Sequence, residues 1–184
     1  MSNIHVVPTR DLSPHDLEVI NAYRKSEFGS VTVIAPHSAG SDQNSPWFLV
    51  KDKSQLVAFG RLHQTIAIDF RGGQHRLLGI ASIVAVVKGH GYGTELMHEI
   101  KGYINQSGLT AVGFCSPKTS PFYAKCGYQI LRGGVKRFRF IGEDGQEQPP
   151  DHPDDDVLYL DRGGLMALAT RYPNEPVTAH RKPW

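Results

Sequence analysis

The residues whose types and spacing suggest chemistry form a glycine loop, Lys88-x-x-Gly91-x-Gly93. A β-branched run over residues 80–87 precedes the loop, and apolar residues at helical spacing follow it, so the pattern predicts strand, loop and helix. Glycines at alternate positions let backbone N–H groups converge, and a helix N-terminus adds about half a positive charge. The loop therefore predicts a site for a phosphate-bearing ligand.

The spacing of known phosphate loops narrows the choice of ligand. A Walker loop needs Gly-x-x-x-x-Gly-Lys-Ser/Thr, and the last glycine of a dinucleotide fingerprint would stand where this chain has Thr94. What remains is a basic or amide residue followed by x-x-Gly-x-Gly. This resembles the pyrophosphate loop of the GNAT superfamily of acyl-CoA-dependent N-acyltransferases, although that family usually has Arg or Gln where this chain has Lys88. A glycine-rich turn without a ligand is the structural alternative.

A second segment, residues 120–128 (SPFYAKCGY), carries the same resemblance. Ser120 as N-cap, Pro121 at the first helical position and Gly127 at the end predict a short helix. The segment is also similar to the Phe-Tyr-x-Lys-x-Gly-Phe/Tyr segment that GNAT enzymes have at this place. The resemblance covers residues 45–132 well, whereas the amino-terminal third agrees only in the order of its elements.

Turn signals and periodicity predict the remaining elements. Ser13 and Pro14 begin a helix that reaches about Phe28 and ends at Gly29. Residues 35–46 are turn formers without periodicity, which predicts a loop that borders a substrate cleft. We expect strands at residues 4–9, 47–51, 56–70, 80–87, 109–115, 129–132 and 135–141, a closing strand at 157–160, and one or two helical turns at 165–170.

The predicted elements up to residue 115 follow the order β-α-β-β-β-α-β. This is also the order of the GNAT fold, which belongs to the α/β (α+β) class. The resemblance implies a single domain over residues 1–184, with a mixed central sheet and helices on both of its faces. An antiparallel N-terminal meander leads into the motif strand, where a parallel pair is expected to splay. A chain of 184 residues with 40% hydrophobic and 21% charged residues suits one soluble domain.

Charge and cysteine content restrict the partners and the compartment. A net charge of +2 favours neither a nucleic acid nor an anionic membrane as partner. No signal peptide or membrane span is predicted, and Cys115 and Cys126 are too few for a disulfide framework. We therefore expect a cytoplasmic protein with both thiols reduced. A homodimer is compatible with these features.

The resemblance implies that an acetyl group moves from acetyl-CoA, without a metal, directly to a primary amine of a small molecule. In such enzymes the pantetheine arm runs along the motif strand, where a backbone N–H polarises the thioester carbonyl. The loop takes the pyrophosphate. Carried over to this chain, the cofactor-binding residues are Ala81, Ser82 and Ile83 on the strand and Lys88, Gly89, His90, Gly91, Tyr92, Gly93 and Thr94 in the loop.

Tyr123 is the residue expected to protonate the leaving thiolate. A thiol has a pKa of about 8.5 and a phenol one of about 10, so a phenol in a dry site is a plausible donor. The alternative is an aromatic pair, Phe122 and Tyr123, that packs a short helix into the core. Cys115 and Cys126 are expected to be small buried apolar groups, because direct transfer needs no acyl-enzyme.

The amine must also lose a proton. At an amine pKa near 10.4, about one molecule in 2,500 is neutral at pH 7. Deprotonating the amine therefore costs a free energy of roughly 4.6 kcal/mol at this pH. Many GNAT enzymes carry a carboxylate on the motif strand, but residues 79–82 of this chain are Gly-Ile-Ala-Ser. The base is therefore left open among His63, His75, Asp69, Glu27 and the C-terminal carboxylate.

The acceptor, and catalysis itself, stay open at the level of sequence. The long meander, the Asp-rich segment and the terminal Trp184 faintly resemble the aminoglycoside 2′-N-acetyltransferase branch, although no acidic cleft for a polycation is evident. The chain could also act on a protein or peptide amine, sense an acyl-CoA without catalysis, or be a nucleotide-binding α/β module. The acidic, proline-rich residues 142–156 predict an exposed loop and lack the spacing of a calcium loop.

Overall fold

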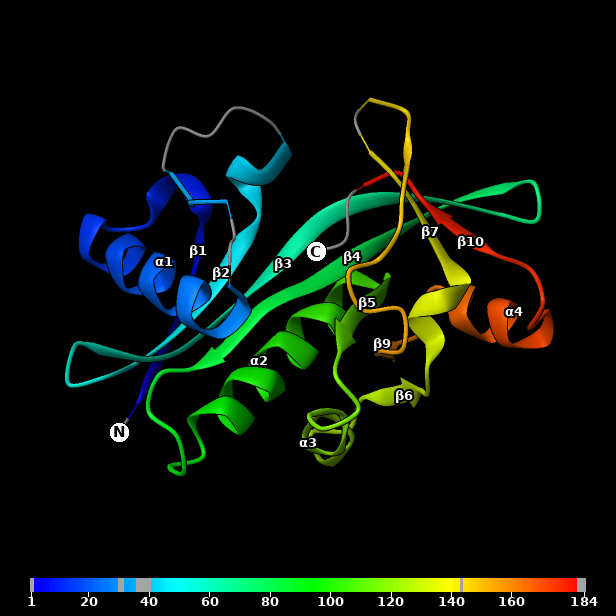
Figure 1. Cartoon of the computed structure of the whole chain (residues 1–184). Helices are drawn as coiled ribbons and strands as arrows, with labels where there is room; N and C mark the ends of the chain where they lie inside the picture. Colours follow the sequence, from blue (N-terminus) through cyan, green and yellow to red (C-terminus); the bar gives the residue numbers. More distant parts are fainter. Residues whose placement is uncertain (1, 30–31, 36–40, 143, 182–184) are drawn as a thin grey trace. The chain divides into compact units, whose positions relative to one another are not determined.

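The computed structural model describes residues 2–29, 32–35, 41–142 and 144–181 (Figure 1). The contacts divide the chain into two compact units. Unit 1 comprises Met1–Gln64 and Ala81–Ile100, and unit 2 comprises Thr65–Ile80 and Lys101–Trp184. Three elements continue from one unit into the other: β3 (Gln55–Phe70), β4 (Gly73–Ala85) and α2 (Tyr92–Ser107).

Unit 1 contains an antiparallel set of strands with a helix before the second strand, as the sequence predicted. Strand β2 pairs with β1 on one side and with β3 on the other. The additional elements of this unit are β1 (Asn3–Pro8), α1 (Pro14–Phe28), β2 (Pro46–Asp52) and the short 3-10 helices η1 (Thr9–Asp11) and η2 (Ser41–Asn44). Residues 36–40 of the expected cleft loop lie outside the described residues, and η2 follows them.

Helix α1 begins and ends where its caps predict. The Ser13 side chain accepts a hydrogen bond from the backbone N–H of Asp16 (3.1 Å), and the Asp16 carboxylate also binds Lys51 Nζ (2.8 Å). Gly29 ends the helix at a φ of 76°. The buried Leu17 and Ile20 pack α1 against one face of β2 and β3 (Figure 1).

The first half of α2 covers the opposite face of the same strands. Successive side chains point to opposite faces of a strand, so Gly60 of β3 faces away from α1. A Cβ atom at Gly60 would lie 2.6 Å from Ile83 Cδ1 and 3.0 Å from Ile100 Cδ1, so only glycine allows α2 this close. The predicted helices on both faces are therefore confirmed in unit 1.

Unit 2 contains strands in the order β6-β9-β5-β4-β3-β10-β7-β8. Strands β4 and β5 are parallel over four pairs, from Leu77↔Thr110 to Ile80↔Gly113, which confirms the predicted parallel pair. The expected splay of this pair stays a prediction. The other elements are β5 (Thr110–Cys115), α3 (Ser120–Lys125), β6 (Gln129–Leu131), η3 (Gly134–Arg137), β7 (Phe138–Ile141), β8 (Glu147–Gln148), β9 (Asp156–Leu160), α4 (Leu165–Arg171) and β10 (Val177–Ala179).

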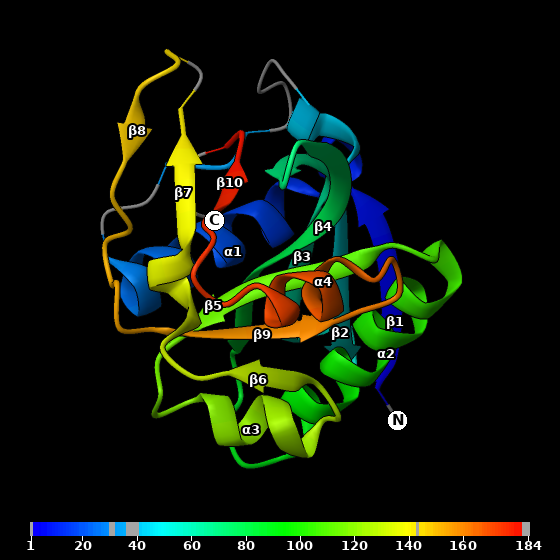
Figure 2. The ribbon, with the colours of Figure 1, turned by 90° about the vertical axis from the view of Figure 1, so that its right-hand side faces the viewer.

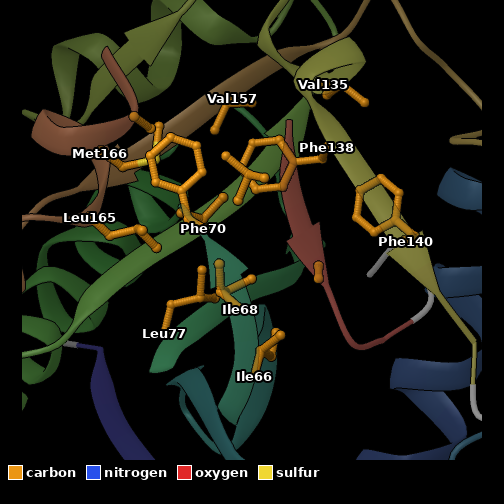
Figure 3. Close-up of a cluster of buried hydrophobic side chains, with 14 residues drawn as sticks. Ile66, Ile68, Phe70, Leu77, Val135, Phe138, Phe140, Val157, Leu165 and Met166 are labelled. Carbon is orange, nitrogen blue, oxygen red and sulfur yellow. The ribbon is translucent and has the colours of Figure 1, made fainter. Parts of the chain in front are cut away.

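The core of unit 2 lies between its strands and α4. Figure 3 shows side chains from β3, β7 and α4 meeting, among them Phe70, Phe138 and Met166. Phe138 and Phe140 both pack edge-on to Phe114, at centroid distances of 5.4 and 5.5 Å. This apolar core supports the β5–β9 pair, whose antiparallel neighbour β6 precedes η3 in the chain (Figure 2).

Four local expectations in unit 2 were wrong. Residues 135–137 belong to η3 because Gly133 takes a left-handed φ of 54°, and β7 begins only at Phe138. The expected loop 142–156 includes β8, which pairs with β7 (Figure 2), and ends in Asp156, which is buried. Strand β9 does not close the chain, because β10 follows it beside β3 and β7. Thr119, not Ser120, is the N-cap of α3.

The buried Asp156 carboxylate connects three segments of unit 2. It accepts hydrogen bonds from Arg132 Nη1 (2.6 Å) and from the backbone N–H of Gly133 (2.8 Å), and Arg132 also donates to Ser120 Oγ. Burial alone would raise the pKa of Asp156, but the hydrogen bonds and the positive charge of Arg132 outweigh burial and lower it. The ionised form is therefore the one that stabilises the fold.

We expect Asp156→Asn to lower the free energy of unfolding by about 1–3 kcal/mol at pH 7, because Arg132 and the Gly133 N–H lose a charged acceptor. The folded pKa is depressed, so this contribution is present above the unfolded value of about 3.9 and is lost as pH falls through the folded pKa. Denaturant unfolding at several pH values measures the effect, with the exposed Asp154→Asn as control. An Asp156→Asn protein as stable as the parent at pH 7 would contradict this role.

Candidate acyl-donor and acceptor site

The motif strand β4 has an unusual backbone at Ser82 in unit 1. Ser82 has a φ of 52°, in the left-handed region that side chains rarely adopt. Its hydroxyl lies 3.2 Å from Arg24 Nε of α1, which donates to it. The buried Ala81 and Val84 flank this position. A left-handed residue locally breaks the alternation of a strand, so its backbone groups point in a new direction.

The loop after β4 has the form that the glycine spacing predicted. Gly89 and Gly91 both have left-handed φ angles, 84° and 81°. The Gly91 carbonyl accepts the N–H groups of Thr94 (2.9 Å) and Glu95 (3.0 Å), and α2 begins at Tyr92. The first N–H groups of a helix have no intrahelical partner and carry a partial positive charge. A Cβ at Gly89 or Gly91 would meet no atom within 4 Å, so the space around these two residues is open.

The side chains of the loop make contacts within unit 1. Lys88 Nζ lies 3.0 Å from Glu27 Oε1, so the loop cation already has an ion-pair partner. His90 Nδ1 is 2.9 Å from the Lys88 carbonyl oxygen, and its ring stacks on Tyr92 at a centroid distance of 6.0 Å. The Tyr92 hydroxyl donates to Asp52 (3.0 Å). These contacts fix the shape of the loop and leave anion binding chiefly to the backbone.

Tyr123 lies in α3 of unit 2, where it is half-buried. Burial raises its pKa well above that of an ordinary phenol, and the thiols of Cys115 and Cys126 add to the shift. Its ring packs edge-on to Phe122 at 5.2 Å. The group is therefore a protonated donor over the whole physiological pH range.

The candidate bases lie in different surroundings. Glu27 is paired with Lys88 in unit 1, and Asp69 lies 2.6 Å from His180 Nε2 in unit 2. His75 is half-buried on the β3–β4 hairpin. The C-terminal carboxylate lies outside the described residues.

His63 is a buried candidate base, and its partners were missed from the sequence. His63 is buried, and its Nδ1 lies 3.1 Å from Asp42 Oδ1 of η2. Asp42 Oδ2 lies 2.7 Å from Arg61 Nη2. The only sequence signal for Asp42 was its position in the expected cleft loop. The structure thus brings a histidine, a carboxylate and a guanidinium together on β3 and η2.

No group of three or more His, Cys, Asp or Glu side chains within the ranges described above could hold a metal ion. Among those same residues, no helix has the length and apolar character needed to cross a bilayer.

Cys115 and Cys126 are buried and reduced, as the sequence predicted. Burial raises the pKa of Cys115 to about 12, with the nearby Asp156 charge adding to the shift. A thiol in this state is a poor nucleophile at neutral pH.

Residues 15–128 match the model of the "Acetyltransferase (GNAT) family". No curated protein sequence matches the chain. An acyl-CoA N-acyltransferase from Pseudomonas aeruginosa is similar in structure, with a TM-score of 0.55, 16% identity, and 86% of this chain and 99% of that chain covered.

Two further solved structures resemble this fold. A Bacillus subtilis acetyltransferase in complex with CoA has a TM-score of 0.53 and 16% identity, covering 88% of this chain and 99% of its own. The ribosomal-protein-S18-alanine N-acetyltransferase from Escherichia coli has a TM-score of 0.54 and 13% identity. The match covers 88% of this chain and 94% of that chain. Identities this low establish the fold alone.

We expect neither thiol of the folded protein to react with an aromatic disulfide reagent within minutes at pH 8. A group with a pKa of about 12 is ionised to only about one part in ten thousand at that pH, and both thiols are buried. Both should react at once in denaturant, which serves as the positive control. Rapid reaction of one thiol per native chain would restore an acyl-enzyme mechanism as a possibility.

Proposed function

The chain belongs to the GNAT acetyltransferase family, and on that premise we propose that it transfers an acetyl group from acetyl-CoA directly to a primary amine of a small molecule. The observation that carries the proposal is the loop at the start of α2. Its left-handed glycines, Gly89 and Gly91, and the N-terminal amides of α2 form a positively polarised surface with open space beside it. A pyrophosphate fits such a surface.

The donor is proposed to lie along the unit 1 part of β4. Ala81, Ser82 and Ile83 would hold the pantetheine arm through their backbone groups, as an added strand is held. The left-handed Ser82 supports this assignment, because a strand interrupted there can direct an N–H group at the thioester carbonyl. Pyrophosphate binding falls to residues 88–94, with Lys88 in a minor role because Glu27 already pairs with it.

Tyr123 is the proposed proton donor to the CoA thiolate. In water, the pKa of a phenol is about 1.5 units above that of a thiol, so transfer of its proton to a thiolate is unfavourable by roughly 2 kcal/mol. Burial weakens the acid, but it strengthens a thiolate base in the same surroundings, as the pKa of about 12 for Cys115 illustrates. The two pKa values therefore rise together, and the proton transfer stays accessible.

The acceptor could instead be a protein amine, or the chain could bind an acyl-CoA without turnover. Release of free thiol from acetyl-CoA across a panel of amines separates an enzyme from a sensor. Location in the cytoplasm, a homodimeric state and a link to the aminoglycoside branch stay predictions.

We expect Gly91→Ala to weaken CoA binding at least tenfold, because a side chain would approach the phosphates. The variant also forces a left-handed alanine, which costs about 1–2 kcal/mol whatever the ligand. Gly72→Ala is the matched control, because Gly72 has the same kind of φ (73°) and equally empty surroundings in the turn between β3 and β4. Both variants should lose similar thermal stability without ligand.

Thermal shift with CoA measures the difference between the two glycine variants. If Gly91→Ala is stabilised by CoA as strongly as Gly72→Ala, the assignment of the loop to phosphate is wrong.

We expect Tyr123→Phe to lower kcat by about 10²–10⁴, with little change in KM for acetyl-CoA, because only the proton donor is removed. Tyr128→Phe removes the same hydroxyl from a buried position in the same segment. This control should lower the melting temperature and leave kcat near that of the parent. A Tyr123→Phe enzyme with kcat within about threefold of the parent would remove Tyr123 from the mechanism.

A further inference from the structure

Two guanidinium groups lie on the α1-facing side of unit 1. Arg24 of α1 donates from Nε to Ser82 Oγ (3.2 Å) and from Nη1 to the Thr32 carbonyl (2.8 Å). Arg61 of β3 is the register partner of Trp47, which belongs to the core cluster under α1. Its guanidinium lies 5.4 Å above the Trp47 ring.

Positive charge exceeds negative charge among Arg24, Arg61 and the carboxylate that faces Arg61, Asp42. Arg61 is only 4% exposed and pairs with Asp42, whose other carboxylate oxygen faces His63. Arg24 donates to uncharged oxygens, so its charge is not matched in the same way. Burial lowers the pKa of Arg24, and the charge of Arg61 lowers it further, as expected for two cations close together in a partly dry region. Two other acids of the unit pair with lysines, Glu27 with Lys88 and Asp16 with Lys51.

The position of the excess charge matters because Arg24 touches Ser82. Ser82 is the left-handed residue of the β4 segment proposed to hold the thioester. A cationic region beside this segment attracts an anionic group of the acceptor.

We propose that Arg24, with the charge of the buried Arg61 adding to its own on the α1 side of β3 and β4, recognises a carboxylate on the acceptor, so that the substrates are small amines that also carry a carboxylate. The inference rests on the proposed function and names its substrate class. The planar guanidinium of Arg24 can turn part of its donor fork to a carboxylate while Nε stays on Ser82. The added negative charge balances this guanidinium, whose hydrogen-bond acceptors on Ser82 and Thr32 are uncharged.

The same arrangement sorts other amines. A polycationic amino sugar would meet two like charges, which disfavours it. A diamine without an acid would leave the charge of Arg24 unneutralised. A phosphate-bearing amine shares the anionic chemistry, and the experiment separates it from a carboxylate.

The test compares each free amino acid with its amide and its decarboxylated amine, using thiol release from acetyl-CoA. Phosphoethanolamine and β-alanine form a pair that distinguishes phosphate from carboxylate. We expect at least one acid to exceed its amide roughly tenfold in kcat/KM, the low end for a charge-assisted hydrogen bond. Arg24→Gln should reduce that preference to within threefold, and Arg24→Lys, which keeps the charge, should retain part of it. Equal use of acids and amides by the parent would overturn the inference, and so would a preference for phosphoethanolamine over β-alanine.

Lys25→Gln is the matched control, because it removes an exposed positive charge from the neighbouring position of α1. It should keep the preference of the parent. Arg24 also donates to Ser82 of the proposed donor segment, so Arg24→Gln can change the KM for acetyl-CoA. The readout is therefore the ratio of acid to amide, because a change in the acetyl-CoA site affects both acceptors alike, and an unchanged ratio in Arg24→Gln would overturn the inference.

Binding is measured apart from turnover by thermal shift with the same acids and amides in the presence of CoA. Acids that stabilise the parent but not Arg24→Gln, without any thiol release, would support the carboxylate site and contradict the transferase. Turnover of amines regardless of a carboxylate would support the transferase and contradict the site. The two proposals therefore fail in different ways.

Discussion

A non-glycine residue held in the left-handed region inside a strand is the constraint on which the candidate site depends. Such a conformation costs about 1–3 kcal/mol and persists only where the surroundings determine it. At Ser82 the surroundings are the buried neighbours Ala81 and Val84 and the hydrogen bond from Arg24. The strain changes the direction of the backbone groups on the segment that is proposed to hold the thioester. Helix α1, capped by Ser13, supplies the side chain that fixes it.

The packing around Gly60 extends this constraint to the phosphate loop. With no side chain at Gly60, α2 lies against β3 and Ile83, the residue after Ser82. The loop between β4 and α2 has left-handed glycines at both Gly89 and Gly91, which lets the chain turn sharply into the helix. The helix N-terminus is thereby fixed relative to the strained strand within unit 1. Both parts of the proposed donor site thus depend on side chains that are small or absent.

The sequence predicted those features whose cause is local. The caps Ser13 and Gly29, the glycine loop and the parallel β4–β5 pair follow from turn chemistry and periodicity, and all three were confirmed. The errors arose where a distant contact overrides local preference. Residues 135–137 read as strand, but a left-handed Gly133 and the Asp156 carboxylate that binds its N–H produce a 3-10 turn.

The candidate site shows the same division between local and distant causes. Asp42 could not be paired with Arg61 and His63 from the sequence, because only the fold brings η2 beside β3. The sequence did not single out Arg24, because nothing local marks a left-handed serine 58 positions later. Turn formers were thus located from the sequence, whereas charge clusters built across elements were not.

The electrostatics of unit 1 also bear on the missing carboxylate of the motif strand. A base beside the acceptor lowers the free energy needed to deprotonate an ammonium group, and neighbouring positive charges lower the same quantity by reducing the pKa of the amine. Each unit of reduction makes the neutral amine ten times more abundant at pH 7. Under the proposed function, the charge of Arg24 and Arg61 therefore takes over part of a base's task only for an acceptor without a carboxylate, because a bound carboxylate neutralises Arg24. An acidic residue at position 82 would pair with Arg24 in the same way, so the serine at this position leaves Arg24 to the carboxylate of the acceptor. For such an acceptor the ammonium proton still needs one of the candidate bases, among which His63 is buried beside Asp42.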